Sequence, residues 1–388
     1  MGRGINWFKN GSKSACSMKK NQRFPRPCTI PGKTVSRPES IRVSHMARTS
    51  LIYHPIYLEH DTDGHPERKE RLITALKKIE ASDLDLEFVT PRPATLEEVE
   101  AIHSPGYIDQ VRSISERGGG YLDLDTVVSR RSFEAALMAA GGVITGIDGV
   151  RKDLDNAFAL VRPPGHHALP NRGMGFCIFN NVAIGTRYAQ KMGLEKVLIV
   201  DWDVHHGNGT SAIFYDDRTV LYFSTHQFPH YPGTGRVKEL GMDGAEGFTV
   251  NVPLPSGTGD SGYLTVFEEI LKPVALEFDP DIVLVSAGQD PHQADPLSGM
   301  NLTTEAFGSM AAAVKEIADS CCEGRLVAAL EGGYNLNALS DSIVAILRSF
   351  KGEAPAPIEV EEDPRVAERI DEVKRAMSPY WNCFKERG

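Results

Sequence analysis

Two adjacent histidines, His166 and His167, follow an apolar run that ends in two prolines and a glycine, FALVRPPGHHA. Near neutral pH a histidine can act as a general base, a proton donor or a metal ligand. Proline cannot continue a β-ladder and glycine lets the backbone turn, so we expect the pair where a strand has ended. Adjacent histidines also occur by chance in loops, so the pair alone does not distinguish a reactive site from a surface loop.

Other strand-like runs also end in residues that could do chemistry. The run KVLIVDWDVHHGNG delivers Asp201, Asp203 and His205, DIVLVSAGQD delivers Asp290, and RLVAALEGGY delivers Tyr334. In open parallel sheets the ligand site lies outside the carboxyl ends of the strands, so these side chains are expected to meet there. One Asp alone is more simply explained as a helix or turn cap. Four strand ends of this kind favour a functional site.

The spacing inside DWDVHHG carries further information. Residues two apart in an extended chain face the same side, so Asp203 and His205 can hold one ion together. With Asp290 from another strand they would supply three nitrogen and oxygen ligands and no sulfur. A fourth position then stays free for water or substrate, which is typical of a catalytic rather than a structural zinc site.

The elements that must position these side chains alternate regularly along the chain. Strand-like runs occupy residues 51–55, 156–165, 196–203, 219–225, 281–288 and 325–333. Segments with the apolar spacing of a helix occupy residues 66–82, 132–151, 181–193, 262–278, 303–321 and 336–350. This alternation predicts an α/β fold, with a mostly parallel sheet covered by helices on both faces. We expect one domain over 49–352, followed by a connector and one helix over 353–388.

The composition is typical of a soluble enzyme-sized chain. Its 388 residues are 41% hydrophobic and 24% charged, enough for a large core. No uninterrupted apolar run approaches the roughly 18 residues that span a bilayer, which argues against a membrane protein. The six cysteines show no C-x-x-C spacing, so neither a zinc ribbon nor a disulfide framework is indicated and a reducing compartment fits best.

Charge is distributed unevenly along the chain. Residues 1–48 hold eleven of the 42 basic residues and one of the 52 acidic residues, which leaves a formal charge of −20 on the remainder. An acidic body argues against direct nucleic-acid binding. The basic segment is expected to be disordered, a transit peptide or an artefact of start-site choice, with Met46 as an alternative initiator. It lacks the apolar core of a secretory signal, and a cytoplasmic location is expected unless residues 1–45 target an organelle.

The motifs RPPGHHA, GFCIFNN, DWDVHHGNGT, STHQFPHYPGTG, SAGQD, DPL and EGGYNL occur in this order. Together they resemble the zinc-dependent histone deacetylase family, which shares its fold with acetylpolyamine amidohydrolases and, distantly, with arginases. The resemblance covers about Leu51 to Phe350 and implies a single-domain arginase/deacetylase-like fold, with the active site at the carboxyl ends of the strands. Asn208 in HHGNG makes the chain similar to the class II branch.

The resemblance also implies roles for the reactive residues. Asp203, His205 and Asp290 would bind zinc, and Tyr334 would polarise the substrate carbonyl. Asp201 would pair with His166 and Asn208 with His167. An acid behind His166 favours its charged form, whereas a neutral amide leaves His167 nearer its free pKa, so His167 is expected to act as the general base.

Further positions follow from the same resemblance. The Gly175 carbonyl would accept the substrate amide N–H, Phe176 and Tyr231 would wall a narrow channel, and Leu297 would lie at its rim. A potassium ion would use Asp201, Asp203, His205, Ser224 and Thr225. Gln289 departs from the family pattern, in which an aromatic residue usually precedes the last zinc ligand. It could alter the pocket floor, or be a neutral replacement turned toward solvent or a helix.

These features lead to an expected activity, hydrolysis of N-ε-acetyl-lysine in proteins or peptides. A small-molecule amidohydrolase acting on acetylpolyamines is the alternative. Polyamine selectivity is expected to need an acidic gate, and Leu297 stands where a Glu would serve. A noncatalytic binding protein of the same fold is disfavoured by the complete set of ligands, histidines and tyrosine. Homo-oligomerisation and acyl-chain preference stay open.

Overall fold

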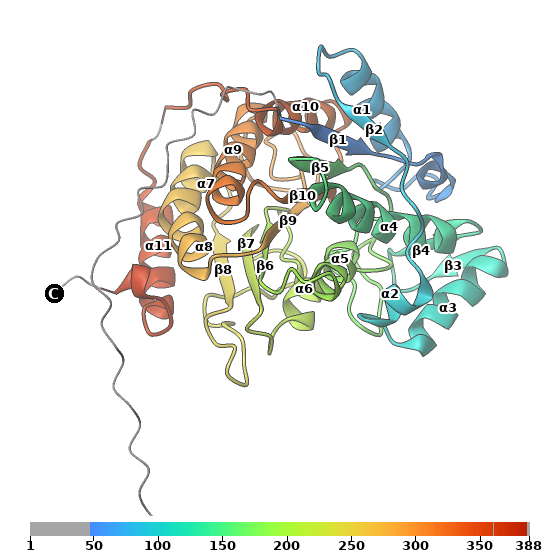
Figure 1. The fold of residues 1–388 in the computed structure, drawn as a ribbon, viewed down its shortest axis with the longest axis horizontal. Coiled ribbons are helices and arrows are strands. Elements are labelled where there is room, and N and C mark those ends of the chain that lie inside the picture. The colour runs from blue at the N-terminus through green and yellow to red at the C-terminus, as the bar shows by residue number, and fades with distance from the viewer. Residues whose placement is uncertain (1–46, 360, 386–388) are drawn as a thin grey trace, which may run out of the picture. The chain divides into compact units, whose positions relative to one another are not determined.

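A parallel β-sheet lies at the centre of the chain (Figure 1). The computed structural model describes residues 47–359 and 361–385. The eight strands follow the order β2-β1-β5-β10-β9-β6-β7-β8, and every neighbouring pair is parallel. Their bounds are β1 Thr49–Ile52, β2 Glu87–Val89, β5 Asn156–Ala159, β6 Val197–Asp201, β7 Val220–Gln227, β8 Thr249–Leu254, β9 Ile282–Ala287 and β10 Leu326–Leu330. The prediction of a mostly parallel sheet is confirmed.

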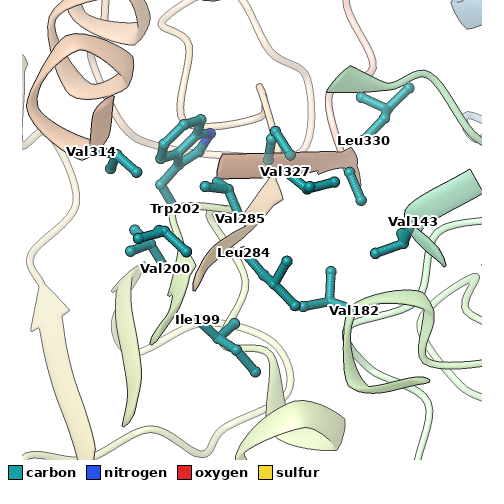
Figure 2. Packing of buried hydrophobic residues seen from close by; sticks show 14 of the residues in the cluster. Val143, Val182, Ile199, Val200, Trp202, Leu284, Val285, Val314, Val327 and Leu330 are labelled. Carbon is teal, nitrogen blue, oxygen red and sulfur yellow. The ribbon is translucent and has the colours of Figure 1, made fainter. Parts of the chain in front are cut away.

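Helices cover both faces of the sheet. On one face α4 (Ser132–Val150) packs against α5 (Asn181–Lys191), and both contact the strands. On the other face α1 (Glu70–Glu80), α10 (Leu336–Phe350), α9 (Thr304–Cys321) and α8 (Lys272–Phe278) pack in succession. The strands alternate between these layers: in β9, Leu284 points toward Val182 of α5 and Val285 toward Val314 of α9 (Figure 2). Both faces are apolar because both are buried.

Smaller elements complete the fold. They are α2 Leu96–Glu100, α3 Pro105–Glu116, α6 Asn208–Ile213, α7 Asp260–Val266, α11 Pro364–Met377, the 3₁₀ turns Pro55–Glu59 and Asn382–Phe384, and an antiparallel pair of β3 Gly119–Tyr121 and β4 Val127–Ser129. The helix predicted over 262–278 is interrupted by a π-helical turn, Phe267–Leu271. That turn ends two residues before Pro273, whose ring and missing N–H disturb the regular hydrogen-bond ladder.

Helix α4 is the one helix of the described residues that is long and apolar enough in composition to cross a membrane. It packs on α5 and β5 here, as the core helix of a globular domain does. Helix α11 contacts β8, and Trp381 beyond it donates its indole N–H to the Gly247 carbonyl at 2.8 Å. The basic segment predicted over 1–48 lies almost entirely outside the described residues.

Candidate active site

The carboxyl ends of β5, β6, β9 and β10 meet at one edge of the sheet because these strands are parallel neighbours. The strand register places Asp201, the last residue of β6, opposite Ser286 of β9 and Ser224 of β7. Asp201 and the segments that follow the four strands carry all the residues expected to react. The structure therefore brings together side chains that lie up to 168 positions apart in the sequence.

Asp203, His205 and Asp290 form a compact group. One potential ligand atom from each lies within 4.8 Å of the others. His205 Nδ1 is 3.1 Å from Asp203 Oδ1 and 3.2 Å from Asp290 Oδ2. The other carboxylate oxygens are oriented by backbone donors, Gly332 N–H to Asp203 Oδ2 at 2.8 Å and Val204 N–H to Asp290 Oδ1 at 3.0 Å. Asp290 Oδ2 is buried and makes no hydrogen bond, and His205 Nδ1 is its polar neighbour.

The group has more negative charge than its neighbours neutralise. Burial and the charge of Asp203 raise the pKa of Asp290 to about 7. Burial would lower the pKa of His205, but its two carboxylate neighbours raise it to about 10. A cation bound to Asp290 Oδ2 would compensate this excess of negative charge. Two carboxylates and one imidazole fit zinc, and a Cβ on Gly332 would collide with Asp290, so glycine is needed where the backbone approaches.

The tandem histidines lie beside this group, with ring centroids 4.0 Å apart. His166 Nδ1 is 3.1 Å from Asp201 Oδ2, and His167 Nδ1 is 2.7 Å from Asn208 Oδ1. Burial alone would lower the pKa of His166, but three nearby carboxylates raise it well above its usual value. Burial and the charge of His166 hold the pKa of His167 well below its usual value. The two rings are therefore suited to opposite protonation states.

Tyr334 follows β10 and is held on several sides. Asp295 Oδ2 accepts its backbone N–H at 2.6 Å, and the Arg71 guanidinium lies over its ring at 5.1 Å. Burial and the charge of Asp290 raise the pKa of the phenol well above its usual value. The hydroxyl therefore keeps its proton at neutral pH and can donate a hydrogen bond.

The residues expected to wall a channel lie around the histidines. Tyr231, 40% exposed, packs its ring 5.2 Å from that of His167, and Phe176 lies 5.8 Å from the Tyr334 ring. Gly175 adopts a φ of 57°, and a Cβ there would collide with the His167 ring. The Leu297 carbonyl is 3.0 Å from His230 Nε2. Gly175 and Tyr231 therefore contact His167, Phe176 contacts Tyr334, and Leu297 is linked to His205 through His230.

The residues expected to hold potassium occupy β6, β7 and the adjoining loop. Ser224 is the register partner of Asp201, and its Oγ lies 2.9 Å from His226 Nδ1. Thr225 Oγ1 is buried and has no hydrogen-bond partner. Tyr222 donates its hydroxyl to Asp201 Oδ2 at 3.0 Å, which ties β7 to the histidine side of the site.

Gln289 is fully buried, so it is not turned toward solvent. Its side-chain Nε2 donates to the Ala287 carbonyl at 2.9 Å, and its backbone N–H donates to the Gly332 carbonyl at 3.0 Å. The glutamine lies against Gly333 and near Leu339 of α10, just before the Tyr334 turn. Its Oε1 has no hydrogen-bond partner.

Several residues at the site were not predicted. They are Glu331, Arg71, Glu67, His65, whose ring meets Phe176 edge-on at 4.4 Å, and His230, which stacks on His205 at 5.0 Å. Glu331 had a usable signal, an acid directly after an entirely apolar strand. Arg71 and Glu67 had none, because charges in a helical segment usually face solvent.

Comparisons with known proteins are consistent with this geometry. A family model described as histone deacetylase domain matches residues 65–350. A probable deacetylase from Archaeoglobus fulgidus is 41% identical over 87% of this chain and 99% of its own length. Chloroplastic histone deacetylase 14 from Arabidopsis thaliana is 40% identical over 80% of this chain and 79% of its own. A crystal structure of the HDA15 HD domain superposes with a TM-score of 0.81, at 34% identity, over 88% of this chain and 97% of that one.

Proposed function

The chain belongs to the histone deacetylase family, and on this premise we propose that it is a zinc-dependent hydrolase that releases acetate from N-ε-acetyl-lysine in proteins or peptides. The observation that carries the proposal is the placement of three metal-ligand candidates, two histidines of opposite proton affinity and a protonated phenol at one sheet edge. Each could have a structural explanation, but the combination supplies what amide hydrolysis requires.

Asp203, His205 and Asp290 would hold the zinc ion. Zinc at this position would supply Lewis-acid activation of water and of the substrate carbonyl. His167 Nδ1 faces the Asn208 carbonyl oxygen, so its proton sits on Nδ1 and Nε2 is left as a free base. His167 would take a proton from the attacking water and return it to the leaving amine, while charged His166 stabilises the developing negative charge.

Tyr334 and the channel residues would orient the substrate. The Tyr334 hydroxyl would donate to the carbonyl oxygen as negative charge develops there. The Gly175 carbonyl would accept the amide N–H, and Phe176 and Tyr231 would flank the alkyl stem. A narrow apolar channel between these residues, ending at the reactive side chains, would suit a long aliphatic amine such as lysine.

One observation favours the acetylpolyamine alternative. Burial raises the pKa of the Tyr231 hydroxyl well above its usual value, and the charges of Cys177 and of Asp125 and Asp123 on the β3–β4 turn add to this. Two acids near the channel rim would attract a second amino group of a polyamine. Leu297, however, places an apolar side chain at the rim position where an acidic gate was expected.

Steady-state kinetics would distinguish the two substrate classes. We expect a zinc-loaded sample to hydrolyse an acetyl-lysine peptide with kcat/KM at least about tenfold above that for a mono-acetylated diamine, because only the peptide fills an apolar rim. Acetate release should be measured in the same assay, with Asp290→Ala as the inactive control. A preference for the diamine would overturn the assignment.

A potassium ion bound through Asp201, Asp203, His205, Ser224 and Thr225 is part of the proposal. The unpartnered Thr225 Oγ1 and the Asp201–Ser224 register support it. Replacing potassium by sodium in the buffer should lower the melting temperature, and an unchanged value would count against the site.

A cytoplasmic location also stays a proposal, since two relatives are named chloroplastic. A fluorescent fusion of residues 1–48 would test organelle targeting.

A further inference from the structure

Glu331 is a fully buried carboxylate that joins three strand ends. It follows β10, and its side chain reaches the loop that carries the tandem histidines. Oε2 accepts the Gly165 N–H at 2.6 Å and the His166 N–H at 3.2 Å. Oε1 accepts the hydroxyl of Ser286, in β9, at 3.1 Å. The loop N–H groups lie outside any ladder, so without this carboxylate they would be buried and unpaired.

Glu331, His166 and Cys177 also have potential metal-ligand atoms within 4.8 Å of one another. Their contacts argue against a second metal site. Both Glu331 oxygens already accept hydrogen bonds, the Cys177 thiol donates to the Gly175 carbonyl at 3.3 Å, and His166 Nδ1 pairs with Asp201. None of these atoms is left without a partner, in contrast to Asp290 Oδ2. The cluster is satisfied internally, as expected of a structural connection.

The segment after β10 is also held from its opposite side. Arg71 donates from Nη2 to the Glu331 carbonyl at 2.5 Å and from Nε to the Gly333 carbonyl at 2.7 Å. Glu67 binds Arg71 at 3.1 Å and Arg162 at 2.8 Å, and Arg162 lies in the tandem-histidine loop. The loop of His167 and the turn of Tyr334 are thus connected at two points, and Glu331 is the direct one.

We propose that Glu331 is a positioning residue whose carboxylate holds the tandem-histidine loop in register with Tyr334. The general base and the phenol act on the same reacting group, so their separation must be kept while the substrate binds and leaves. A displacement of about 1 Å at such a site can cost about 100-fold in rate. The kinetic consequence rests on the proposed deacetylase function, whereas the structural connection does not.

Two substitutions separate the reach of Glu331 from its charge. Glu331→Gln keeps the length: its amide oxygen can accept both N–H groups and its amide nitrogen can donate to Ser286. Glu331→Asp keeps the charge but is one methylene shorter and cannot span the gap. We expect Glu331→Asp to lower kcat on an acetyl-lysine peptide by about 30- to 100-fold, with KM changed less than about threefold and zinc retained. Glu331→Gln should stay within about fivefold of wild type.

Amide hydrogen exchange gives a readout that does not require activity. In zinc-loaded Glu331→Asp, peptides covering 163–168 should exchange faster than in wild type, whereas those of β10 should not change. Glu331→Gln should match wild type. Ser286→Ala is the matched control, because it removes one hydrogen bond to Glu331 and leaves both loop N–H bonds.

The outcomes are distinguishable from failure of the proposed function. If wild type does not hydrolyse acetyl-lysine, the exchange comparison still tests the connection. Unchanged exchange at 163–168 in Glu331→Asp would overturn the proposal. Equal losses of kcat in Glu331→Asp and Glu331→Gln would also overturn it, because the charge rather than the reach would then matter.

Discussion

Two buried clusters of charged side chains face Tyr334 and differ in how their charges are balanced. In the Glu67 cluster, one carboxylate binds two guanidinium groups, Arg71 and Arg162, and lies 3.6 Å from His60. In the Asp290 cluster, two carboxylates, Asp203 and Asp290, share one imidazole, His205. The side chains of the Glu67 cluster are at most 2% exposed, and His205 is 12% exposed.

The pKa values of Glu67 and Asp290 move in opposite directions. Burial would raise the pKa of Glu67, but the neighbouring guanidinium groups hold it well below its usual value. Burial and a second carboxylate raise the pKa of Asp290 to about 7. A cluster whose charges are paired within the chain stabilises the fold. A cluster with unbalanced negative charge and a buried carboxylate oxygen that makes no hydrogen bond is suited to a cation from outside. This difference separates a structural from a functional ionic group.

The largest expected effect is the loss of activity when the Asp290 cluster loses one of its metal ligands. Asp290→Ala should abolish bound zinc and reduce acetyl-lysine hydrolysis to background, because two ligands from one short segment cannot hold the ion alone. Metal content and acetate release should be measured after dialysis against a chelator and reloading. Full activity after this treatment would show that the cluster is not a metal site.

The second-largest expected effect is a loss of stability when the Glu67 cluster loses its carboxylate. Glu67→Gln should destabilise the protein by about 3–5 kcal/mol, because two buried guanidinium groups lose their counter-charge. Urea unfolding would measure it. Glu97→Gln is the control, since Glu97 pairs with Lys191 on the surface and both are well exposed, so no measurable change is expected. Equal stability of the two variants would contradict the contrast between buried and exposed pairs.

The third prediction concerns the hydroxyl of Tyr334, the residue that both clusters face. Tyr334→Phe keeps the ring under Arg71 and removes one hydroxyl, so folding and zinc content should hardly change. The expected loss in kcat is about 100- to 1000-fold, or about 3–4 kcal/mol, with a smaller change in KM. Steady-state kinetics on an acetyl-lysine peptide measure it. A drop of less than about fivefold with zinc retained would mean that the tyrosine only packs.

The smallest effect is a pH dependence arising from His60. Burial and the charge of Arg162 lower the pKa of His60 to about 3, below the value of about 6.5 in an unfolded chain. The unfolded state therefore binds a proton that the native state does not, and stability is lost as pH falls from about 6.5 toward 3. The slope from this group is at most about 1.4 kcal/mol per pH unit.

His60→Asn should flatten this dependence, because asparagine can bond Ser132 as His60 Nδ1 does, at 2.6 Å, without titrating. Free energies of unfolding at pH 7.5 and pH 5 should be compared between variant and wild type. An unchanged difference between the two pH values would show that His60 does not titrate as described.

The fold was predictable to the extent that it depends on local pattern. Each of the six strand-like runs overlaps an observed strand of the central sheet, although β1 begins two residues before its run and β7 ends two residues after its run. The two strands of this sheet that were missed, β2 and β8, lie at its edges, and the separate pair of β3 and β4 was missed as well. β2 has three residues and β8 includes Asn251 and Pro253, so neither presents the apolar run that marks a central strand.

The sequence by itself determined which residues stand at the strand ends, since Pro, Gly and the apolar runs that precede them are local signals. That was enough to predict that Asp203, His205 and Asp290 would meet. Only the tertiary structure decided which charges are paired: Arg71 reaches the Glu331 carbonyl across 260 positions, and Glu331 reaches Gly165 across 166. Whether a charge is buried, and which charge neutralises it, depends on the packing of distant segments, and no local pattern encodes it.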